Sequence, residues 1–179
     1  MRDLTSAAAA IGDRHVGLAL RVPTPAGRAL VEQWIASPAL TAWWGSRASA
    51  EARIRMAQAQ AIAVCRMIEV AGVPIGYAQS LDFGAAAGDG AGLPAGAWEC
   101  DIVVGSQPHR GLGYGSAALD ALVQEVFATT LALACVIAIP VHSERVARAC
   151  ERIGFRWLRI VRDAAAGPIW IMARERPIR

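Results

Sequence analysis

The chain has 179 residues, of which 55% are hydrophobic and 18% are charged, and its formal net charge is +3. This composition is typical of a globular domain and excludes a disordered chain, and the small charge gives no reason to expect a nucleic-acid partner. All 18 basic residues are arginine. Their identity excludes a Walker-type phosphate loop and Schiff-base catalysis, because both need a lysine.

The first part of the chain predicts two helices and three strands. Apolar spacing and turn residues predict, in chain order, a strand over 17–22, a helix over 25–35, a helix over 50–60, and strands over 61–70 and 75–81. A turn at 71–74 joins the last two strands, so we expect them to form a hairpin.

The second part predicts four further strands and two helices. In chain order these are a glycine-rich loop over 84–97, a strand over 98–104, a glycine turn, a helix over 116–130, a strand over 131–139, a helix over 143–153, and strands over 155–161 and 169–174. Ser143 is expected to cap the second helix and Gly154 to end it. This order predicts one α/β domain over residues 1–179.

Three glycines, Gly111, Gly113 and Gly115, lie between a predicted strand and a predicted helix. Glycine tolerates positive φ and lets the backbone approach a ligand closely. The first N–H groups of a helix lack intrahelical partners and favour an anion, and Arg110 adds a positive charge beside them. The turn therefore predicts a phosphate site, although its spacing differs from the dinucleotide fingerprint. The alternative is a tight connection between strand and helix.

The run RGLGYG, residues 110–115, matches the R/Q-x-x-G-x-G/A pyrophosphate loop of the GNAT superfamily of acyl-CoA N-acyltransferases. The preceding strand, the following helix and the later run RACERIGF also resemble that superfamily, over nearly the whole chain. The resemblance implies the GNAT fold, an α/β (α+β) arrangement with a central mixed, mostly antiparallel sheet of about six or seven strands and about four helices. It also implies acetyl-CoA as cosubstrate and no metal.

Four runs resemble the aminoglycoside 6′-N-acetyltransferases, to which the siderophore-type acetyltransferases are related. They are WWG at 43–45, IGYAQS at 75–80, CDIVVGSQPHRGLGYG at 100–115 and GPIWIM at 167–172. The resemblance implies direct transfer of an acetyl group from acetyl-CoA to a primary amine. The alternatives are a siderophore hydroxylamine or another metabolite amine as acceptor, and a CoA-binding module without catalysis.

Asp101 occupies the position at which the aminoglycoside group carries an aspartate, ten residues before the first glycine of the loop. The resemblance implies that it binds the amine or removes its proton, since an ammonium must lose a proton before it attacks a thioester. Strand alternation places Glu99 and Asp101 on one face, where two carboxylates attract a cationic amine and raise each other's pKa. The alternative is a carboxylate that caps a turn.

The resemblance implies that backbone N–H groups near Val103 and Val104 stabilise the developing oxyanion, where the strand leaves its neighbour. The expected cofactor-binding residues are Val103, Val104, Arg110, Gly111, Leu112, Gly113, Tyr114, Gly115, Ser116, Ser143 and Arg148. Ser143 replaces the asparagine that is usual in relatives. Arg148 belongs to a stripe with Arg145 and Arg152 that either meets the 3′-phosphate of CoA or forms a solvated face.

The resemblance also suggests residues for the acceptor and for the leaving thiolate. The expected substrate-binding residues are Trp44, Tyr77, Gln79, Asp82, Glu99 and Asp101. Trp44 stacks on a sugar ring or fills the core. Cys150 stands where relatives carry a tyrosine acid, so it is a candidate to protonate the leaving thiolate. The alternative for Cys150 is a buried structural cysteine.

The remaining features concern location and partners. The four cysteines have no CxxC pairing and the three histidines have no metal-ligand spacing, which predicts reduced thiols, no metal and a cytoplasmic protein. The sequence suggests neither a signal peptide nor a membrane span. We expect an amine and CoA as partners, no nucleic acid, no membrane, and a monomer or homodimer.

Overall fold

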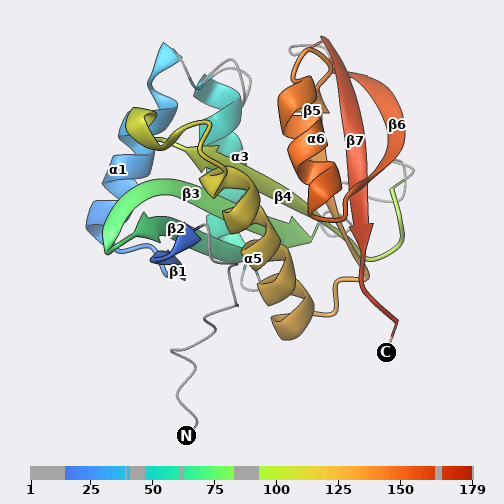
Figure 1. The fold of residues 1–179 in the computed structure, drawn as a ribbon, viewed down its shortest axis with the longest axis horizontal. Helices are drawn as coiled ribbons and strands as arrows, with labels where there is room; N and C mark the ends of the chain where they lie inside the picture. The colour runs from blue at the N-terminus through green and yellow to red at the C-terminus, as the bar shows by residue number, and fades with distance from the viewer. Residues whose placement is uncertain are drawn as a thin grey trace, which may run out of the picture.

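Seven strands form one mixed sheet in the order β1-β2-β3-β4-β5-β7-β6. The structure is a computed structural model that describes residues 15–38, 40, 47–60, 63–82, 93–163 and 167–178. Its elements are β1 (Leu18–Arg21), α1 (Pro25–Ile35), α3 (Arg47–Ala59), β2 (Val64–Val70), β3 (Val73–Asp82), β4 (Ala97–Val104), the 3-10 turn η3 (Gln107–His109), α5 (Tyr114–Thr129), β5 (Ala134–Pro140), α6 (Glu144–Arg152), β6 (Arg156–Asp163) and β7 (Gly167–Glu175). Figure 1 shows their arrangement.

These elements confirm the predicted α/β order, and most boundaries differ from the predicted ones by a few residues. The helix predicted over 25–35 has those bounds, because Thr24 accepts a hydrogen bond from the N–H of Gly27 and proline opens the helix. The predicted hairpin joins β2 to β3 through Ala71 and Gly72, which both have positive φ, as in a type I′ turn. Of the predicted loop 84–97, only 93–97 lie within the described residues.

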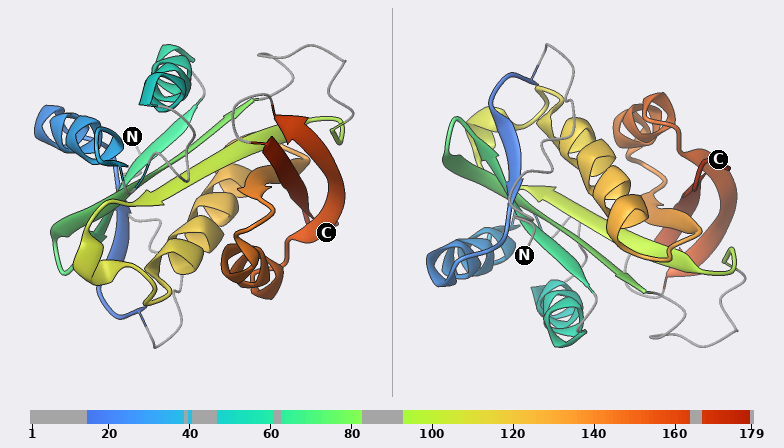
Figure 2. Two further views of the ribbon diagram at one scale, coloured as in Figure 1. Left: turned by 90° about the horizontal axis from the view of Figure 1, so that it is seen from above. Right: turned by 90° about the horizontal axis from the view of Figure 1, so that it is seen from below.

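The four helices in the described part of the chain cover the two faces of the sheet. Figure 2 shows α1 and α3 on one face and α5 and α6 on the other. The core on the α5 face includes Leu122 of α5 and Cys150 of α6. The smaller core on the opposite face includes Val31 of α1 and Ile54 of α3. Among the described helices, none combines the length and hydropathy that crossing a bilayer requires.

The side chains of strand β4 point alternately to the two faces of the sheet. Trp98 and Cys100 belong to the core on the α5 face, whereas Val103 belongs to the core under α1 and α3. This confirms the predicted alternation, in which Glu99, Asp101 and Val103 share a face. Asp101 therefore lies on the face covered by α1 and α3.

Strands β4 and β5 form the parallel pair of this sheet, and they pair only briefly. Their register runs from Ala97–Ala134 to Glu99–Val136, and the other neighbouring strands pair in antiparallel fashion. Beyond Glu99, β4 continues beside β3 alone, as far as Val104 opposite Gly76. The sheet therefore parts between β4 and β5 at the end of β4 that leads into the glycine turn.

Candidate active site

The turn after β4 needs glycine at two of its three glycine positions. Gly111 has φ 75° and Gly113, which is the N-cap of α5, has φ 91°. Residues other than glycine rarely adopt these φ angles. Gly115 lies inside the first turn of α5 without positive φ, and a Cβ there would make only an ordinary contact with Val104, at 3.6 Å. Its glycine is therefore not required by the fold of the turn.

The N-terminus of α5 has three backbone donors without intrahelical partners. The first hydrogen bond of the helix runs from the N–H of Ala117 to the C=O of Gly113, at 3.1 Å. The N–H groups of Tyr114, Gly115 and Ser116 come before it and so lack a carbonyl one turn earlier. With the positive end of the helix dipole, this geometry suits an anion such as a phosphate.

Two arginines and a histidine contact the turn. Arg110 donates to the carbonyls of Val104 (2.9 Å) and Gly105 (2.7 Å), which fixes the turn against the end of β4. Arg145 of α6 donates to the carbonyl of Gly111 at 2.9 Å, and Nε2 of His15 lies 3.2 Å from the carbonyl oxygen of Leu112. The loop thus has positive charge around it and a fixed backbone.

Ser143, the N-cap of α6, is buried with an unused hydroxyl. The residue is 4% exposed, and its Oγ has no hydrogen-bond partner among the described residues. The position of the cap is the predicted one, but the side chain makes no capping hydrogen bond. A buried hydroxyl without a partner is costly, so this atom is a candidate ligand contact. Arg148 of α6 is exposed and forms an ion pair with Glu144, at 3.4 Å.

Asp101 is the centre of a buried hydrogen-bond cluster. Its carboxylate accepts from Arg53 of α3 through Nε (3.1 Å, to Oδ2) and Nη2 (2.5 Å, to Oδ1). Nε2 of Gln79 donates to the same Oδ2 at 3.0 Å, and the hydroxyl of Tyr77 donates to Oε1 of Gln79 at 3.1 Å. Arg53 also donates to Glu99 at 2.7 Å. The structure thus brings the predicted residues Tyr77, Gln79 and Glu99 into one cluster with Asp101.

The charges in this cluster depend on one another. Burial alone would lower the pKa of Arg53, but the carboxylates of Asp101 and Glu99 raise it above its ordinary value, so the guanidinium stays charged. Burial raises the pKa of Glu99, the charge of Asp101 raises it further, and Arg53 opposes both effects. Burial also raises the pKa of Tyr77, which keeps its hydroxyl protonated as a donor to Gln79.

Other predicted site residues lie elsewhere. Cys150 is buried in the core on the α5 face, and burial raises the pKa of its thiol to about 12; this position favours packing over proton transfer. Asp82 lies opposite Trp98 in the β3–β4 register, so strand alternation places it on the face away from Asp101. Trp44 lies outside the described residues.

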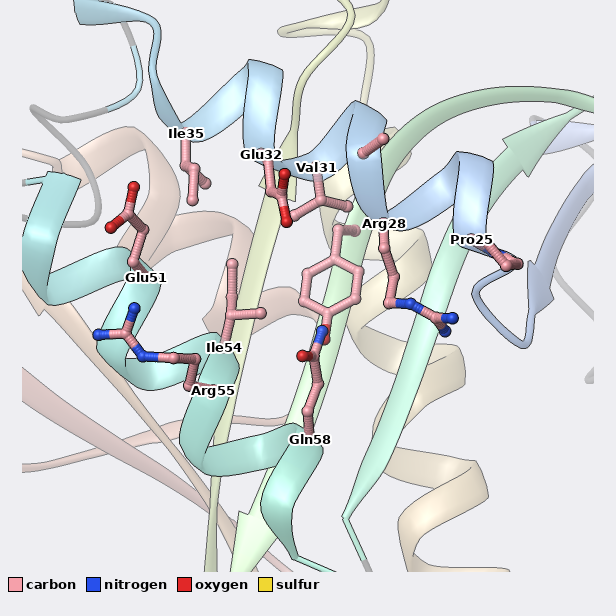
Figure 3. A pocket seen from close by; sticks show the side chains of 11 residues that line it. Pro25, Arg28, Val31, Glu32, Ile35, Glu51, Ile54, Arg55 and Gln58 are labelled. Carbon is pink, nitrogen blue, oxygen red and sulfur yellow. The ribbon is translucent and has the colours of Figure 1, made fainter.

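A pocket of about 570 Å³ lies between α1 and α3, and Figure 3 shows the side chains that line it. Arg28 and Glu32 come from α1, and Glu51 and Arg55 come from α3. Tyr77 lines the pocket from β3, and it connects the pocket to Asp101 through Gln79. The volume is within the range of small-molecule sites.

Several residues that shape this site were not predicted from the sequence. Arg53 is the most informative of them, because Ala50, Arg53, Ile54 and Ala57 form a stripe at helical spacing in which only Arg53 is charged. A lone charge on a buried stripe indicates a buried partner of opposite sign. No comparable sequence pattern marked Trp34 as part of the site. Its ring lies where a Cβ on Gly105 would stand, with Cδ2 at 2.0 Å from that position, beside the end of β4.

The fold has the arrangement expected of the GNAT class, and a family model identifies the chain as a member of it. Residues 26–162 match the sequence model described as acetyltransferase (GNAT) domain. The chain belongs to this family.

A comparison with curated protein sequences gives no significant match. Solved structures with the same fold include aminoglycoside acetyltransferase AAC(6')-Ib in complex with coenzyme A, with a TM-score of 0.73 and 25% identity over 89% of this chain and 95% of that one. Spermidine N-acetyltransferase from Vibrio cholerae, in complex with CoA and spermine, gives 0.70 and 12% over 89% and 95%. Aminoglycoside N(6')acetyltransferase from Legionella pneumophila gives 0.70 and 15% over 89% and 92%. These likenesses confirm the predicted GNAT fold.

Proposed function

We propose that the protein transfers an acetyl group from acetyl-CoA to the primary amine of a small molecule. The observation that supports this most strongly is the course of β4. The strand carries Asp101 on the α1/α3 face, leaves β5 after Glu99, and ends at a turn whose helix N-terminus is open to an anion. The candidate base and the candidate phosphate site thus lie on one strand and the turn that follows it.

The residues at the turn fit CoA. The N–H groups of Tyr114, Gly115 and Ser116 suit the diphosphate, and the buried Oγ of Ser143, which has no partner among the described residues, is our candidate for a further contact. The N–H groups near Val103 and Val104, on the segment of β4 that has left β5, are our candidates for the thioester oxygen as it gains charge. When bound, acetyl-CoA supplies a thioester carbonyl carbon that an amine can attack.

Asp101 is our candidate for the proton acceptor. The new bond joins the amine nitrogen to the acetyl carbon, the carbon–sulfur bond breaks, and the thiolate leaves. An ammonium acceptor loses two protons: Asp101 accepts the one that is lost before the nitrogen attacks, and the second passes to water as the amide forms. We assign the protonation of the thiolate to water. Gln79 and Arg53 hold the carboxylate in one orientation, so that its position does not depend on the acceptor.

The acceptor has two candidates. An amino sugar of the aminoglycoside type is suggested by the structures that share this fold, which include two named as aminoglycoside acetyltransferases. A metabolite with a single amine is favoured by the pairing of Asp101 with Arg53, which leaves little negative charge for a polycation. Because acetyl-CoA is a metabolite of the cell interior, we propose that the protein acts in the cytoplasm.

A panel of amines tests this function. Purified protein is mixed with acetyl-CoA and, in turn, aminoglycosides, simple amino sugars, polyamines, hydroxylamines and monoamines. Free thiol is followed with a chromogenic reagent, and the product is identified by mass spectrometry. We expect amine-dependent thiol release and an N-acetylated product with at least one amine. Tight CoA binding with no thiol release from any acceptor would contradict the proposal and indicate a CoA-binding module.

A further inference from the structure

Arg53 occupies a place on α3 that a packing side chain would ordinarily fill. Ala50, Ile54 and Ala57 of the same stripe are buried, whereas the guanidinium of Arg53 extends to two carboxylates of β4. Its side chain is 34% exposed and its partner Asp101 is 9% exposed, so solvent screens this pair less than a surface ion pair. The contact joins a helix to the sheet face on which we place the acceptor.

The hydrogen bonds of this cluster leave little room on Asp101. A carboxylate has about four lone-pair sites, two on each oxygen. Oδ2 accepts from both Arg53 and Gln79, and Oδ1 accepts from Arg53. Among the described residues, one site on Oδ1 therefore has no donor. On Glu99, Oε1 accepts from Arg53, and no hydrogen bond of Oε2 is found in the described part of the chain.

The charges on this face also favour a single ammonium group. With both carboxylates ionised, Glu99 and Asp101 carry two negative charges, and Arg53 neutralises one of them, which leaves a formal charge of −1. The adjoining pocket contains Arg28 and Arg55 against Glu32 and Glu51, so it adds no net charge. A single ammonium matches this balance, whereas a polycation would bring charges that the described residues do not neutralise.

We infer that Arg53 is a specificity-determining residue, which by neutralising one of the two carboxylates limits the acceptor to an amine with one positive charge near the reacting nitrogen. The inference rests on the proposed function, since it concerns the acceptor side of the same site. A polycationic amine, such as an aminoglycoside or spermine, is then a poor acceptor because its second charge meets the guanidinium of Arg53.

Acceptors matched in chemistry and different in charge test this inference. The first pair is 6-amino-6-deoxyglucose and kanamycin, which both present a primary amine on a sugar; the second is a monoamine and spermine. Turnover is measured for each, and the affinity of each amine is measured separately by calorimetry. We expect the wild-type protein to prefer the singly charged member of each pair.

Four variants separate charge from structure. Arg53→Gln raises the negative charge of the site by one, so the ratio of polycation to monocation kcat/KM should rise at least about tenfold, mainly through KM. Arg53→Lys keeps the charge and should keep the wild-type ratio. Arg53→Gln combined with Glu99→Gln restores the formal charge of −1 and should return the ratio toward wild type. Arg159→Gln, on the exposed edge strand β6, is the distant control.

The outcomes are distinct. A ratio that stays constant across all variants would overturn the inference, as would a wild-type protein that prefers kanamycin and spermine. Arg53→Gln leaves two carboxylates without their ion-pair partner, which lowers stability. Where this variant does not fold, the double variant and Arg53→Lys carry the test, with thermal unfolding measured for each. If no amine releases thiol from the wild-type protein, the proposed function fails, and the calorimetric affinities still decide whether Arg53 selects by charge.

Discussion

Nε2 of His15 lies 2.8 Å from the position that a Cβ atom on Gly113 would occupy. Gly113 also has φ 91°, so a side chain there would both strain the backbone and displace the histidine. Gly115, two residues on, has neither constraint. A substitution at Gly113 therefore changes the backbone of the turn, whereas a substitution at Gly115 leaves that backbone unchanged.

Gly113→Val should abolish CoA binding. The substitution costs about 1–2 kcal/mol of backbone strain and moves the amides that we propose to hold the diphosphate. Gly115→Ala is the matched control, because its Cβ meets only Val104 at an ordinary distance. We expect CoA affinity, measured by calorimetry, to fall more than about tenfold in the first variant and to stay within about twofold in the second. Wild-type affinity in Gly113→Val would refute the diphosphate site.

Ser143→Ala should affect stability and CoA binding in opposite directions. The buried Oγ has no partner among the described residues, so its removal should leave the free energy of unfolding unchanged or raise it. If CoA uses this hydroxyl, affinity falls about two- to tenfold, which corresponds to about 0.5–1.5 kcal/mol for one hydrogen bond. Thr129→Ala, at the exposed far end of α5, is the control for loss of a hydroxyl. Unchanged affinity in Ser143→Ala would exclude the serine from the CoA site.

Cys150→Ala should leave turnover nearly unchanged. The thiol is buried in the core on the α5 face and burial raises its pKa to about 12, so it is a poor proton donor near neutral pH. We expect kcat within about twofold of wild type and a loss of stability of about 1 kcal/mol from the small cavity. A fall in kcat of more than tenfold, with CoA affinity intact, would restore Cys150 as the acid.

Arg176→Ala should destabilise the fold without touching the site. The guanidinium donates to the carbonyls of Phe127, Thr130 and Ala132, at and just beyond the end of α5. These carbonyls are at the negative end of the helix and otherwise lack intrahelical donors. Urea unfolding should show a loss of about 2–3 kcal/mol, against less than about 0.5 kcal/mol for Arg159→Ala on the exposed edge strand. Equal effects of the two variants would contradict the role of Arg176 as a helix clamp.

Local signals predicted the elements well where a side chain marked the boundary. Helix α1 starts at Pro25, as predicted, and Gly154, with φ 96°, lies just beyond the end of α6, where a terminating glycine was expected. Helix α5 starts at Tyr114, two residues before its predicted start, because its N-cap is Gly113 and a glycine offers no capping side chain to detect. The 3-10 turn η3 was not predicted, since three residues are too few for a periodic pattern.

The site residues on β4 were predictable from the sequence, but their partner on another element was not. Strand alternation placed Glu99 and Asp101 together, and the resemblance to a known family implied that the loop after them binds pyrophosphate. The partner Arg53 is 48 residues away on a separate helix, and the docking of that helix on the sheet depends on packing that no local pattern encodes. The charged position on its apolar stripe was the available signal.

The most direct test of the central claim is turnover and CoA binding in Asp101→Asn. An amide cannot accept the amine proton, so we predict that kcat/KM falls by more than about tenfold, within the range typical of a lost general base. CoA affinity should persist, because the turn and the N-terminus of α5 are not altered, and thermal unfolding should confirm a folded protein. Unchanged turnover in this variant would contradict the assignment of Asp101 and with it the proposed mechanism.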